Sequence, residues 1–384
     1  MPDPLRDPAP VPVRPGETTG EDPALGLFQV LREDGRARGE WAPDLGAKTL
    51  RAMFRHMLRV RLLDERMMMR QRQGKVGFYG AITGQEATPI AAGFALKTQD
   101  WVFPALRESA IMLVRGFPLT RYIAQVYGNA GDVLKGRQMP SHMSGRAVNQ
   151  VAWSSCLGPQ LPQAVGAAMA AKHRGDDAVV LGFIGDGATS EPDFHAAMNF
   201  AGVFKPPVVL ICQNNHWAIS VPSEKQTASA TFAVKARAYG IPGVRVDGND
   251  VLGTYRVIKE AVLRAREGEG PTFIEAVTYR IGAHSSSDDP TRYRSEEEVE
   301  AWRQKDPLQR FERFLRSEGH LDDGLRDSLE AELEAEIKAA ITEVEAMPRP
   351  ATETLFEDVY ADVPWHLRAQ EDELRAADPP PGHD

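Results

Sequence analysis

The stretch that decides the fold runs from Ala178 to Ser220 and reads AVVLGFIGDGATSEPDFHAAMNFAGVFKPPVVLICQNNHWAIS. Two apolar runs, Val179 to Ile184 and Val208 to Cys212, have the length and β-branched content of buried parallel strands. A segment of helical character, Ser190 to Val203, separates them. We therefore predict a strand–helix–strand unit of an open α/β sheet, a fold class in which ligands bind beyond the carboxyl ends of the strands.

A polar group follows each of these two runs. Gly185-Asp186-Gly187 comes after the first, and Asn214-Asn215 comes after the second. A carboxylate oxygen and an amide oxygen are ligands that magnesium accepts, together with phosphate oxygens and water. The glycines allow a diphosphate to approach the backbone closely, and the start of the helix near Ser190 adds a positive dipole end. The pattern therefore indicates a site for magnesium and a diphosphate.

Plainer interpretations exist for each half of the pattern. A Gly-Asp-Gly turn or an Asn-Asn loop alone is usually structural, but their separation by 29 positions (215 minus 186) after two strands is more specific. A dinucleotide site requires G-x-G-x-x-G, and Ser190 stands where its third glycine belongs. No G-x-x-x-x-G-K-[ST] phosphate loop occurs either. Both alternative nucleotide-binding motifs are therefore weak.

Composition limits the class of protein. The chain has 384 residues, 42% of them hydrophobic, which suffices for one large core. A net charge of −9 disfavours a nucleic-acid surface, and no apolar run reaches the roughly 18 residues of a membrane helix. Cys156 and Cys212 form neither a disulfide framework nor a zinc site. The N-terminus lacks a signal peptide and is too acidic for a transit peptide, so we expect a cytoplasmic, bacterial protein.

The rest of the chain divides into three parts. We expect a disordered or extended arm over residues 1–45, a single α/β domain over residues 46–367, and a fraying tail over residues 368–384. The domain should begin with an amphipathic helix at residues 48–74 and end its sheet with a strand at residues 271–280. Strands that alternate with helices predict three α/β/α layers around a mostly parallel sheet.

The spacing of the central motifs resembles that of thiamine diphosphate enzymes. There, Gly-Asp-Gly is followed about thirty residues later by two asparagines, and magnesium anchors the diphosphate of the cofactor. The resemblance implies that Asp186, the second asparagine Asn215 and the backbone carbonyl of Trp217 bind Mg²⁺. It also implies the thiamine diphosphate-binding fold.

A second block, YRIGAHSSSDDPTRYR at residues 279–294, resembles the active-site loop of 2-oxo acid dehydrogenase α subunits. In that family the histidine at the position of His284 faces the cofactor and assists proton and acyl transfer, a role that suits a histidine titrating near neutrality. The paired Asp288-Asp289 favours the branched-chain members, because pyruvate enzymes more often carry a single aspartate. Ser285 and Ser295 match serines phosphorylated in some relatives, and we interpret them here as loop hydrogen-bonders.

Further blocks match the same family. The resemblance implies that the Arg107 guanidinium contacts the cofactor, although Leu106 stands where the family usually has a tyrosine. It also places His142 in the wall of the site. Cys156 and Pro159 depart from the form that binds potassium, so that ion is not predicted. The aromatic residues of the closing motif at 354–367 should dock on the folded body. The implied cofactor-binding set is Arg107, Ser155, Leu157, Gly185, Asp186, Gly187, Ala188, Asn215 and His284.

The resemblance implies an oxidative decarboxylation of branched-chain 2-oxo acids, with transfer of the acyl unit to a lipoyl group of a separate acyltransferase. No convincing glutamate for the pyrimidine ring of the cofactor is present, and in the family a β subunit supplies it. An α2β2 heterotetramer that is inactive as a lone α chain is therefore implied. Three alternatives remain: a pyruvate or acetoin dehydrogenase α subunit, a single-chain thiamine enzyme, and a non-catalytic assembly subunit.

Overall fold

A five-stranded parallel sheet forms the centre of the protein. The computed structural model describes residues 22, 24–38 and 41–377, so most of the predicted N-terminal arm and the last seven residues lie outside the described part. The sheet order is β1-β2-β3-β7-β6, and every neighbouring pair is parallel. Its strands are β1 (Trp101–Phe103), β2 (Val180–Gly185), β3 (Val208–Asn214), β6 (Gly243–Asp247) and β7 (Thr272–Val277). The three predicted strands are present: β2 is shifted by one residue, β3 extends two residues further than expected, and β7 is shorter than the expected 271–280.

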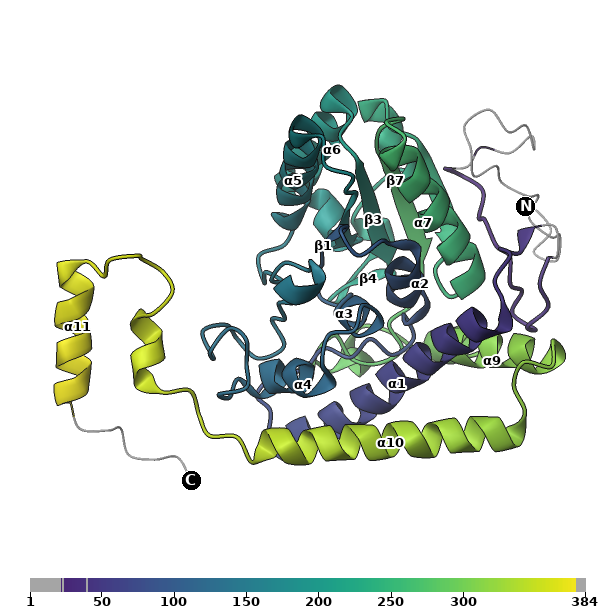
Figure 1. The fold of residues 1–384 in the computed structure, drawn as a ribbon. Helices are drawn as coiled ribbons and strands as arrows, with labels where there is room; N and C mark the ends of the chain where they lie inside the picture. Colours follow the sequence, from purple (N-terminus) through teal and green to yellow (C-terminus); the bar gives the residue numbers. More distant parts are fainter. Residues whose placement is uncertain (1–21, 23, 39–40, 378–384) are drawn as a thin grey trace.

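Helices cover both faces of this sheet, as three α/β/α layers require (Figure 1). One face packs on α5 (Gln160–Arg174) and α6 (Pro192–Phe204), and the other packs on α2 (Ala87–Ala95) and α7 (Val251–Arg266). Two separate hydrophobic clusters fill these layers. Residues in β3 and β7 are buried along their whole length, because a parallel strand between two helical layers has no solvent face.

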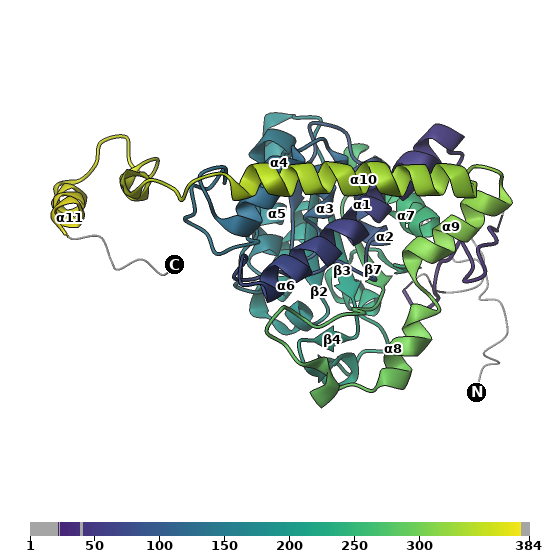
Figure 2. The same cartoon turned by 90° about the horizontal axis from the view of Figure 1, so that it is seen from below.

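A further helical layer lies outside α2 and α7 (Figure 2). The long helix α1 (Ala47–Arg72) confirms the predicted amphipathic helix, and it packs on α9 (Pro307–Ser317) and α10 (Asp323–Glu345). Leu333, Ile337 and Ile341 of α10 are buried, so the apolar stripe of this helix belongs to the core and not to a coiled coil. The remaining elements are α3 (Ala110–Val114), α4 (Leu119–Tyr127), α8 (Glu296–Arg303), the hairpin β4 (Trp217–Ala218) and β5 (Val221–Pro222), and short 3-10 turns, among them η3 (Gly187–Ser190).

The C-terminal segment differs from expectation. After Pro348 and Pro350 the chain leaves the body, and the short turn η7 (Thr352–Phe356) and the helix α11 (Trp365–Ala376) stand apart from it (Figure 1). Trp365 is 81% exposed, and no residue of α11 is buried. The prediction that these aromatics dock on the body was therefore wrong for this chain. Ion pairs of Lys135 and Arg137 with Asp358 hold only the base of the segment.

No helix in the described part of the chain is both long and apolar enough to cross a membrane.

Candidate active site

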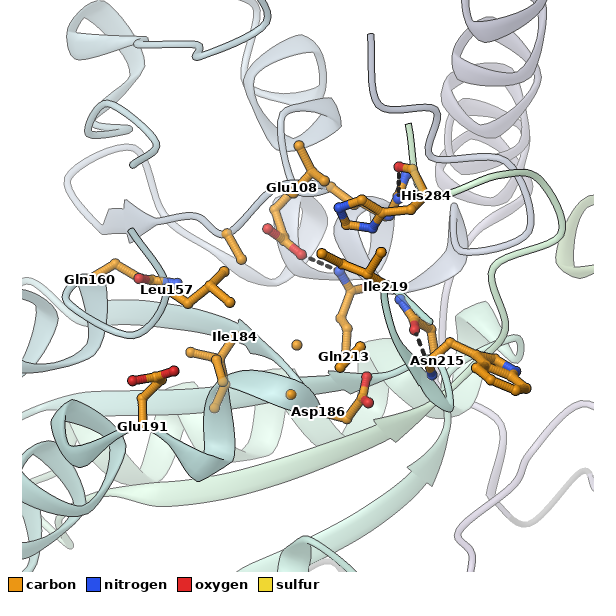
Figure 3. A pocket seen from close by; sticks show the side chains of 18 of the residues that line it. Glu108, Leu157, Gln160, Ile184, Asp186, Glu191, Gln213, Asn215, Ile219 and His284 are labelled. Atoms are coloured by element: carbon orange, nitrogen blue, oxygen red, sulfur yellow. Dashed lines mark hydrogen bonds between the residues drawn. The ribbon is translucent and has the colours of Figure 1, made fainter. Parts of the chain in front are cut away.

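A cavity of about 520 Å³ lies beyond the carboxyl ends of β2 and β3. The predicted site residues come from five segments far apart in the sequence, and the structure places every one of them in the wall of this cavity (Figure 3). They are Arg107, Ser155, Leu157, Gly185, Asp186, Gly187, Ala188, Asn215, Trp217 and His284. The fold therefore brings together in one place the residues that the two sequence blocks singled out.

Asp186 and Asn215 directly follow two neighbouring parallel strands. Gly185 at the end of β2 pairs with Gln213 in β3, so Asp186 is level with Asn214, and Asn215 follows one residue later at the same edge of the sheet. The Asp186 carboxylate is 1% exposed and accepts the backbone N–H of Asn215 and, at 3.5 Å, the hydroxyl of Ser223. Burial raises the pKa of Asp186 to about 6, with these hydrogen bonds acting in the opposite direction. The carboxylate is therefore ionised at neutral pH, at a site that burial makes favourable for a cation.

The neighbouring oxygens complete a donor set for a hard cation. Asn215 Oδ1 accepts the backbone N–H of Trp217 at 3.2 Å, and the carbonyl of Trp217 receives Arg280 Nη1 at 3.4 Å. Among the described residues no group of three His, Cys, Asp or Glu side chains is arranged to hold a metal. One carboxylate, one amide oxygen and one backbone carbonyl match magnesium, which takes its remaining ligands from phosphate and water.

Two buried arginines lie close to His284: Arg107 lines the cavity, and Arg280 contacts His284 and the Trp217 carbonyl, which belong to its wall. Arg107 donates to the carbonyl of Ala81 and, at 2.6 Å, to that of His284. Burial lowers the pKa of Arg107 to about 10, and the charge of Arg280 adds to this effect. Neither guanidinium has an ion pair with a carboxylate in the described part of the chain, although both are at least nine-tenths buried. Buried charges are normally paired, so an anion is the partner that this site lacks.

The glycines of the Gly-Asp-Gly turn have separate steric roles. A Cβ at Gly185 would meet no atom within 4 Å, so the backbone is open to the cavity at this point. A Cβ at Gly187 would lie 2.5 Å from Cβ of Ala218, so only glycine permits the turn to pack against the β4 strand. The first glycine thus leaves space for a ligand, and the second allows close approach of two chain segments. The cavity therefore fits a group that combines a diphosphate with a divalent cation.

His284 lies above the cavity on the loop that follows β7 (Figure 3). Its Nδ1 faces Arg280 Nη1 at 3.3 Å, and since a guanidinium can only donate, Nδ1 accepts and the ring proton resides on Nε2. Burial lowers the pKa of His284 to about 4, with Arg107 and Arg280 adding to the effect. The expectation of titration near neutrality therefore does not hold for the ligand-free chain, in which the imidazole is neutral.

Hydrogen bonds order the loop that carries His284. Asp288 accepts the backbone N–H of His284 at 2.8 Å and the hydroxyl of Tyr293 at 2.5 Å. Asp289 instead caps the following 3-10 turn through the N–H of Thr291, and it lies outside the cavity. The second aspartate therefore shapes the loop and does not contact a ligand in the cavity. Ser295 is the N-cap of α8, as the hydrogen-bonding interpretation of that serine expects.

The loop that precedes α5 forms another part of the cavity wall. His142 is buried, stacks on Trp153 with 3.9 Å between ring centroids, and hydrogen-bonds to the hydroxyl of Ser155. It supports the wall without lining the cavity itself, in agreement with the role expected for it. Leu157 is 59% exposed at the rim, so the cavity opens to solvent beside it.

Several polar residues of the wall were not among the predicted set. Gln85, Glu108, Gln160 and Glu191 line the cavity together with Gln213, which lies two residues before Asn215 in the chain. Gln213 donates through Nε2 to Glu108, while burial raises the pKa of Glu108 to about 7 (Figure 3). No sequence signal separates these residues from ordinary glutamines and glutamates, because their position depends on tertiary packing.

Comparisons with known proteins agree with this geometry. The dehydrogenase E1 component family matches residues 54–353. The 3-methyl-2-oxobutanoate dehydrogenase subunit alpha of Mycobacterium tuberculosis is 42% identical over 350 residues, which cover 91% of this chain and 93% of the relative. The mitochondrial 2-oxoisovalerate dehydrogenase subunit alpha 2 of Arabidopsis thaliana is 42% identical over 320 residues, covering 83% of this chain and 68% of the relative. The pyruvate dehydrogenase E1 component subunit alpha of Staphylococcus aureus is 40% identical over 346 residues, covering 90% and 91%. With this extent of similarity, the chain belongs to the dehydrogenase E1 component family, among its α subunits.

Proposed function

We propose that this protein is the α subunit of a thiamine diphosphate-dependent dehydrogenase that decarboxylates branched-chain 2-oxo acids and passes the acyl unit to a lipoyl group. One observation carries the proposal: Asp186 and Asn215, at the ends of two neighbouring parallel strands, line the same cavity that Arg107 and His284 enter from distant segments. Thiamine diphosphate, when bound, supplies the carbon nucleophile and the electron sink for the decarboxylation.

The residues of this chain would hold the anionic end of the cofactor. Asp186, Asn215 Oδ1 and the carbonyl of Trp217 are the proposed ligands of Mg²⁺, and Arg107 is the proposed counterion of the diphosphate. Gly185 leaves the space that this group requires. An anion beside Arg107 and Arg280 would offset their charge at His284, so its pKa would rise from about 4 toward neutrality.

His284 is the proposed catalytic residue. Its Nε2–H faces away from the Arg280 contact, and neutral imidazole donates a hydrogen bond from this atom. Asp288 fixes the backbone of the histidine, which sets the direction of the ring. With a pKa moved toward neutrality, the ring would take up a second proton on Nδ1, which requires its contact with Arg280 to open; the Nε2–H of the imidazolium could then donate its proton during acyl transfer.

Exposed apolar side chains at the rim of the cavity favour contact with a partner chain. Leu157 and Ile219 are 59% and 52% exposed at the cavity, and apolar side chains of the C-terminal segment are exposed as well. Glu108 accepts a hydrogen bond from Gln213, which lies two residues before Asn215. Its carboxyl group therefore lies at the end of the cavity where we propose that the diphosphate binds. We propose that a β subunit in an α2β2 heterotetramer completes the site and supplies the glutamate for the pyrimidine ring, and that a lipoyl-bearing acyltransferase receives the product. The domain start at residue 46 and a cytoplasmic location are part of this proposal, whereas α11 (Trp365–Ala376) crosses the limit expected at residue 367.

The apolar part of the wall favours a branched apolar substrate. It consists of Phe78, Ala105, Leu106, Trp153, Leu157 and Ile219. Since Asp289 does not reach the cavity, substrate preference depends on these side chains and not on the aspartate pair. A relative named as a pyruvate dehydrogenase subunit is almost as similar as the branched-chain relatives, so pyruvate is the competing substrate.

Turnover of the co-expressed α and β subunits tests the proposal. With thiamine diphosphate, Mg²⁺ and a lipoyl domain, kcat/KM for 3-methyl-2-oxobutanoate should exceed that for pyruvate by at least about tenfold, as expected for apolar contacts with additional methyl groups. A preference for pyruvate would replace the substrate assignment and leave the reaction class intact. Activity of the lone α chain would contradict the two-chain site, and a loaded pair without turnover on any 2-oxo acid would favour a non-catalytic subunit.

A further inference from the structure

Gln85 occupies a position that the cofactor resemblance does not assign. The residue is fully buried, precedes α2, and lines the same cavity as Asp186 and Asn215. Its backbone N–H closes a turn onto the carbonyl of Ile82 at 2.9 Å, so its main chain is fixed on the segment that also contacts Arg107.

The two ends of the Gln85 side chain have different surroundings. Oε1 accepts Asn215 Nδ2 at 3.3 Å. Nε2 is completely buried and has no hydrogen-bond partner among the described residues. A buried amide nitrogen without an acceptor carries a desolvation penalty, which a ligand oxygen in the cavity would remove.

The contact with Asn215 also determines the orientation of that amide. The oxygen and nitrogen of an asparagine have nearly the same shape, so only their partners decide which one faces a given direction. Gln85 Oε1 can only accept, and therefore it selects Nδ2 of Asn215 on its side. Asn215 Oδ1 is then directed to the side of the Trp217 N–H.

Buried ionic groups hold the segment that carries Gln85. Asp64 of α1 accepts the hydroxyl of Tyr79 and the backbone N–H groups of Ile82 and Thr83, each at 2.7 Å. Glu86 accepts the N–H of Gly84 at 2.9 Å and pairs with Arg61 at 2.5 Å. These bonds fix the backbone on both sides of Gln85, so its side chain is preorganised before any ligand arrives.

We propose that Gln85 is a further binding residue of this site, with Nε2 donating to an anionic oxygen of a bound diphosphate and Oε1 orienting Asn215 for its cation. This inference rests on the proposed function and adds to it a residue that acts on both the anion and the metal side. The donor function and the orienting function are separable, because different atoms of one side chain perform them.

Two substitutions separate these functions in the co-expressed α and β subunits. Gln85→Glu keeps an acceptor for Asn215 Nδ2 and replaces the donor with an anion. Gln85→Met keeps the length of the side chain and removes both atoms. The matched control is Gln125→Glu, because Gln125 is equally buried, accepts the N–H of Ser144 through Oε1 and leaves Nε2 unpartnered, but lies outside the cavity.

Binding is measured by the quenching of tryptophan fluorescence, since Trp153 and Trp217 line the cavity. We expect Gln85→Glu to raise the Kd for thiamine diphosphate at saturating Mg²⁺ by tenfold or more, and to weaken competition by inorganic diphosphate equally. Affinity for thiamine without its diphosphate should stay unchanged. Gln85→Met should also raise the Kd, and it alone should raise the Mg²⁺ concentration required for half-maximal binding. Gln125→Glu should leave all of these values unchanged.

The outcomes distinguish this inference from the proposed function. If the wild-type complex fails to bind thiamine diphosphate, the proposed function is wrong. If the wild-type binds and both Gln85 variants bind within twofold of it, Gln85 is not a ligand and the inference is overturned. Equal losses in Gln85→Glu and Gln125→Glu would assign the effect to a buried charge and would also overturn it. If the Gln85→Glu variant does not assemble with the β subunit, the Kd of Gln85→Met for thiamine diphosphate decides whether Gln85 is a ligand.

Discussion

Replacing Gly185 with alanine separates cofactor binding from folding. A Cβ at this position meets no protein atom within 4 Å, and Gly185 lies in the cavity wall directly before Asp186. The folded chain should therefore accept the methyl group without loss of stability. The added carbon instead occupies the space proposed for the diphosphate. Forcing one extra carbon into a filled site costs about 1–3 kcal/mol, which corresponds to roughly a fivefold to 150-fold rise in Kd.

Two further glycines provide the comparison for this variant. Gly187→Ala would bring its Cβ to 2.5 Å from Cβ of Ala218, so that variant should lose thermal stability as well as cofactor affinity. Gly166→Ala on α5 meets no atom within 4 Å and lies outside the cavity, so neither property should fall.

The assay combines thermal unfolding of the cofactor-free α and β pair with isothermal titration of thiamine diphosphate at saturating Mg²⁺. We expect Gly185→Ala to unfold within about 2 °C of the wild-type, since a change of 1 kcal/mol would shift Tm by at most a few degrees at this size. An unchanged Kd for Gly185→Ala would refute the placement of the diphosphate at the end of β2. A large loss of stability would refute the assignment of open space at this glycine.

Three other predictions follow from the charged groups of the site. Burial raises the pKa of Glu108 from 4.5 to about 7, so the folding stability of the wild-type falls as pH rises through this interval. Glu108→Gln should therefore raise Tm relative to the wild-type at pH 8 but not at pH 4.5 or below. The gain is at most about 3 kcal/mol, from 2.5 pH units at 1.36 kcal/mol each; equal Tm differences at both pH values would contradict it. Asp186→Ala should weaken Mg²⁺-dependent thiamine diphosphate binding by more than about 100-fold in calorimetric titration, exceeding the loss typical of an outer-sphere partner. His284→Ala should lower single-turnover acyl transfer to a lipoyl domain by about 100-fold or more while changing the cofactor Kd less than threefold, and the reverse pattern would make His284 a binding residue only.

The central strand–helix–strand unit was predictable because its signals are local. Continuous apolar runs such as Val208 to Cys212 read as buried parallel strands without knowledge of their neighbours. Their proximity then follows, since Asp186 and Asn215 each come directly after a strand and parallel strands end at the same edge of a sheet. The two asparagines were not distinguishable from local sequence. Asn214 is the last residue of β3 and donates to Glu275 of β7, whereas Asn215 turns to the cavity.

The residues that the sequence left unassigned are those whose environment depends on distant packing. Gln85 and Gln125 look alike in the sequence, yet one lines the cavity and the other does not. The neutral state of His284 likewise depends on two arginines, 177 and four positions away in the chain (284 minus 107 and 284 minus 280). The exposure of Trp365 was also unexpected, because an aromatic side chain predicts burial without specifying which chain covers it.

Sequence by itself determined the fold class, the positions of the strands and the identity of the groups at their ends, because backbone propensity and apolar periodicity are encoded over a few neighbouring residues. Only the tertiary structure decided which amides face the cavity, which carboxyl groups have a raised pKa and which buried arginines have no ion-paired carboxylate among the described residues. Those properties arise from burial and from charges brought together across hundreds of residues, and no local pattern records them.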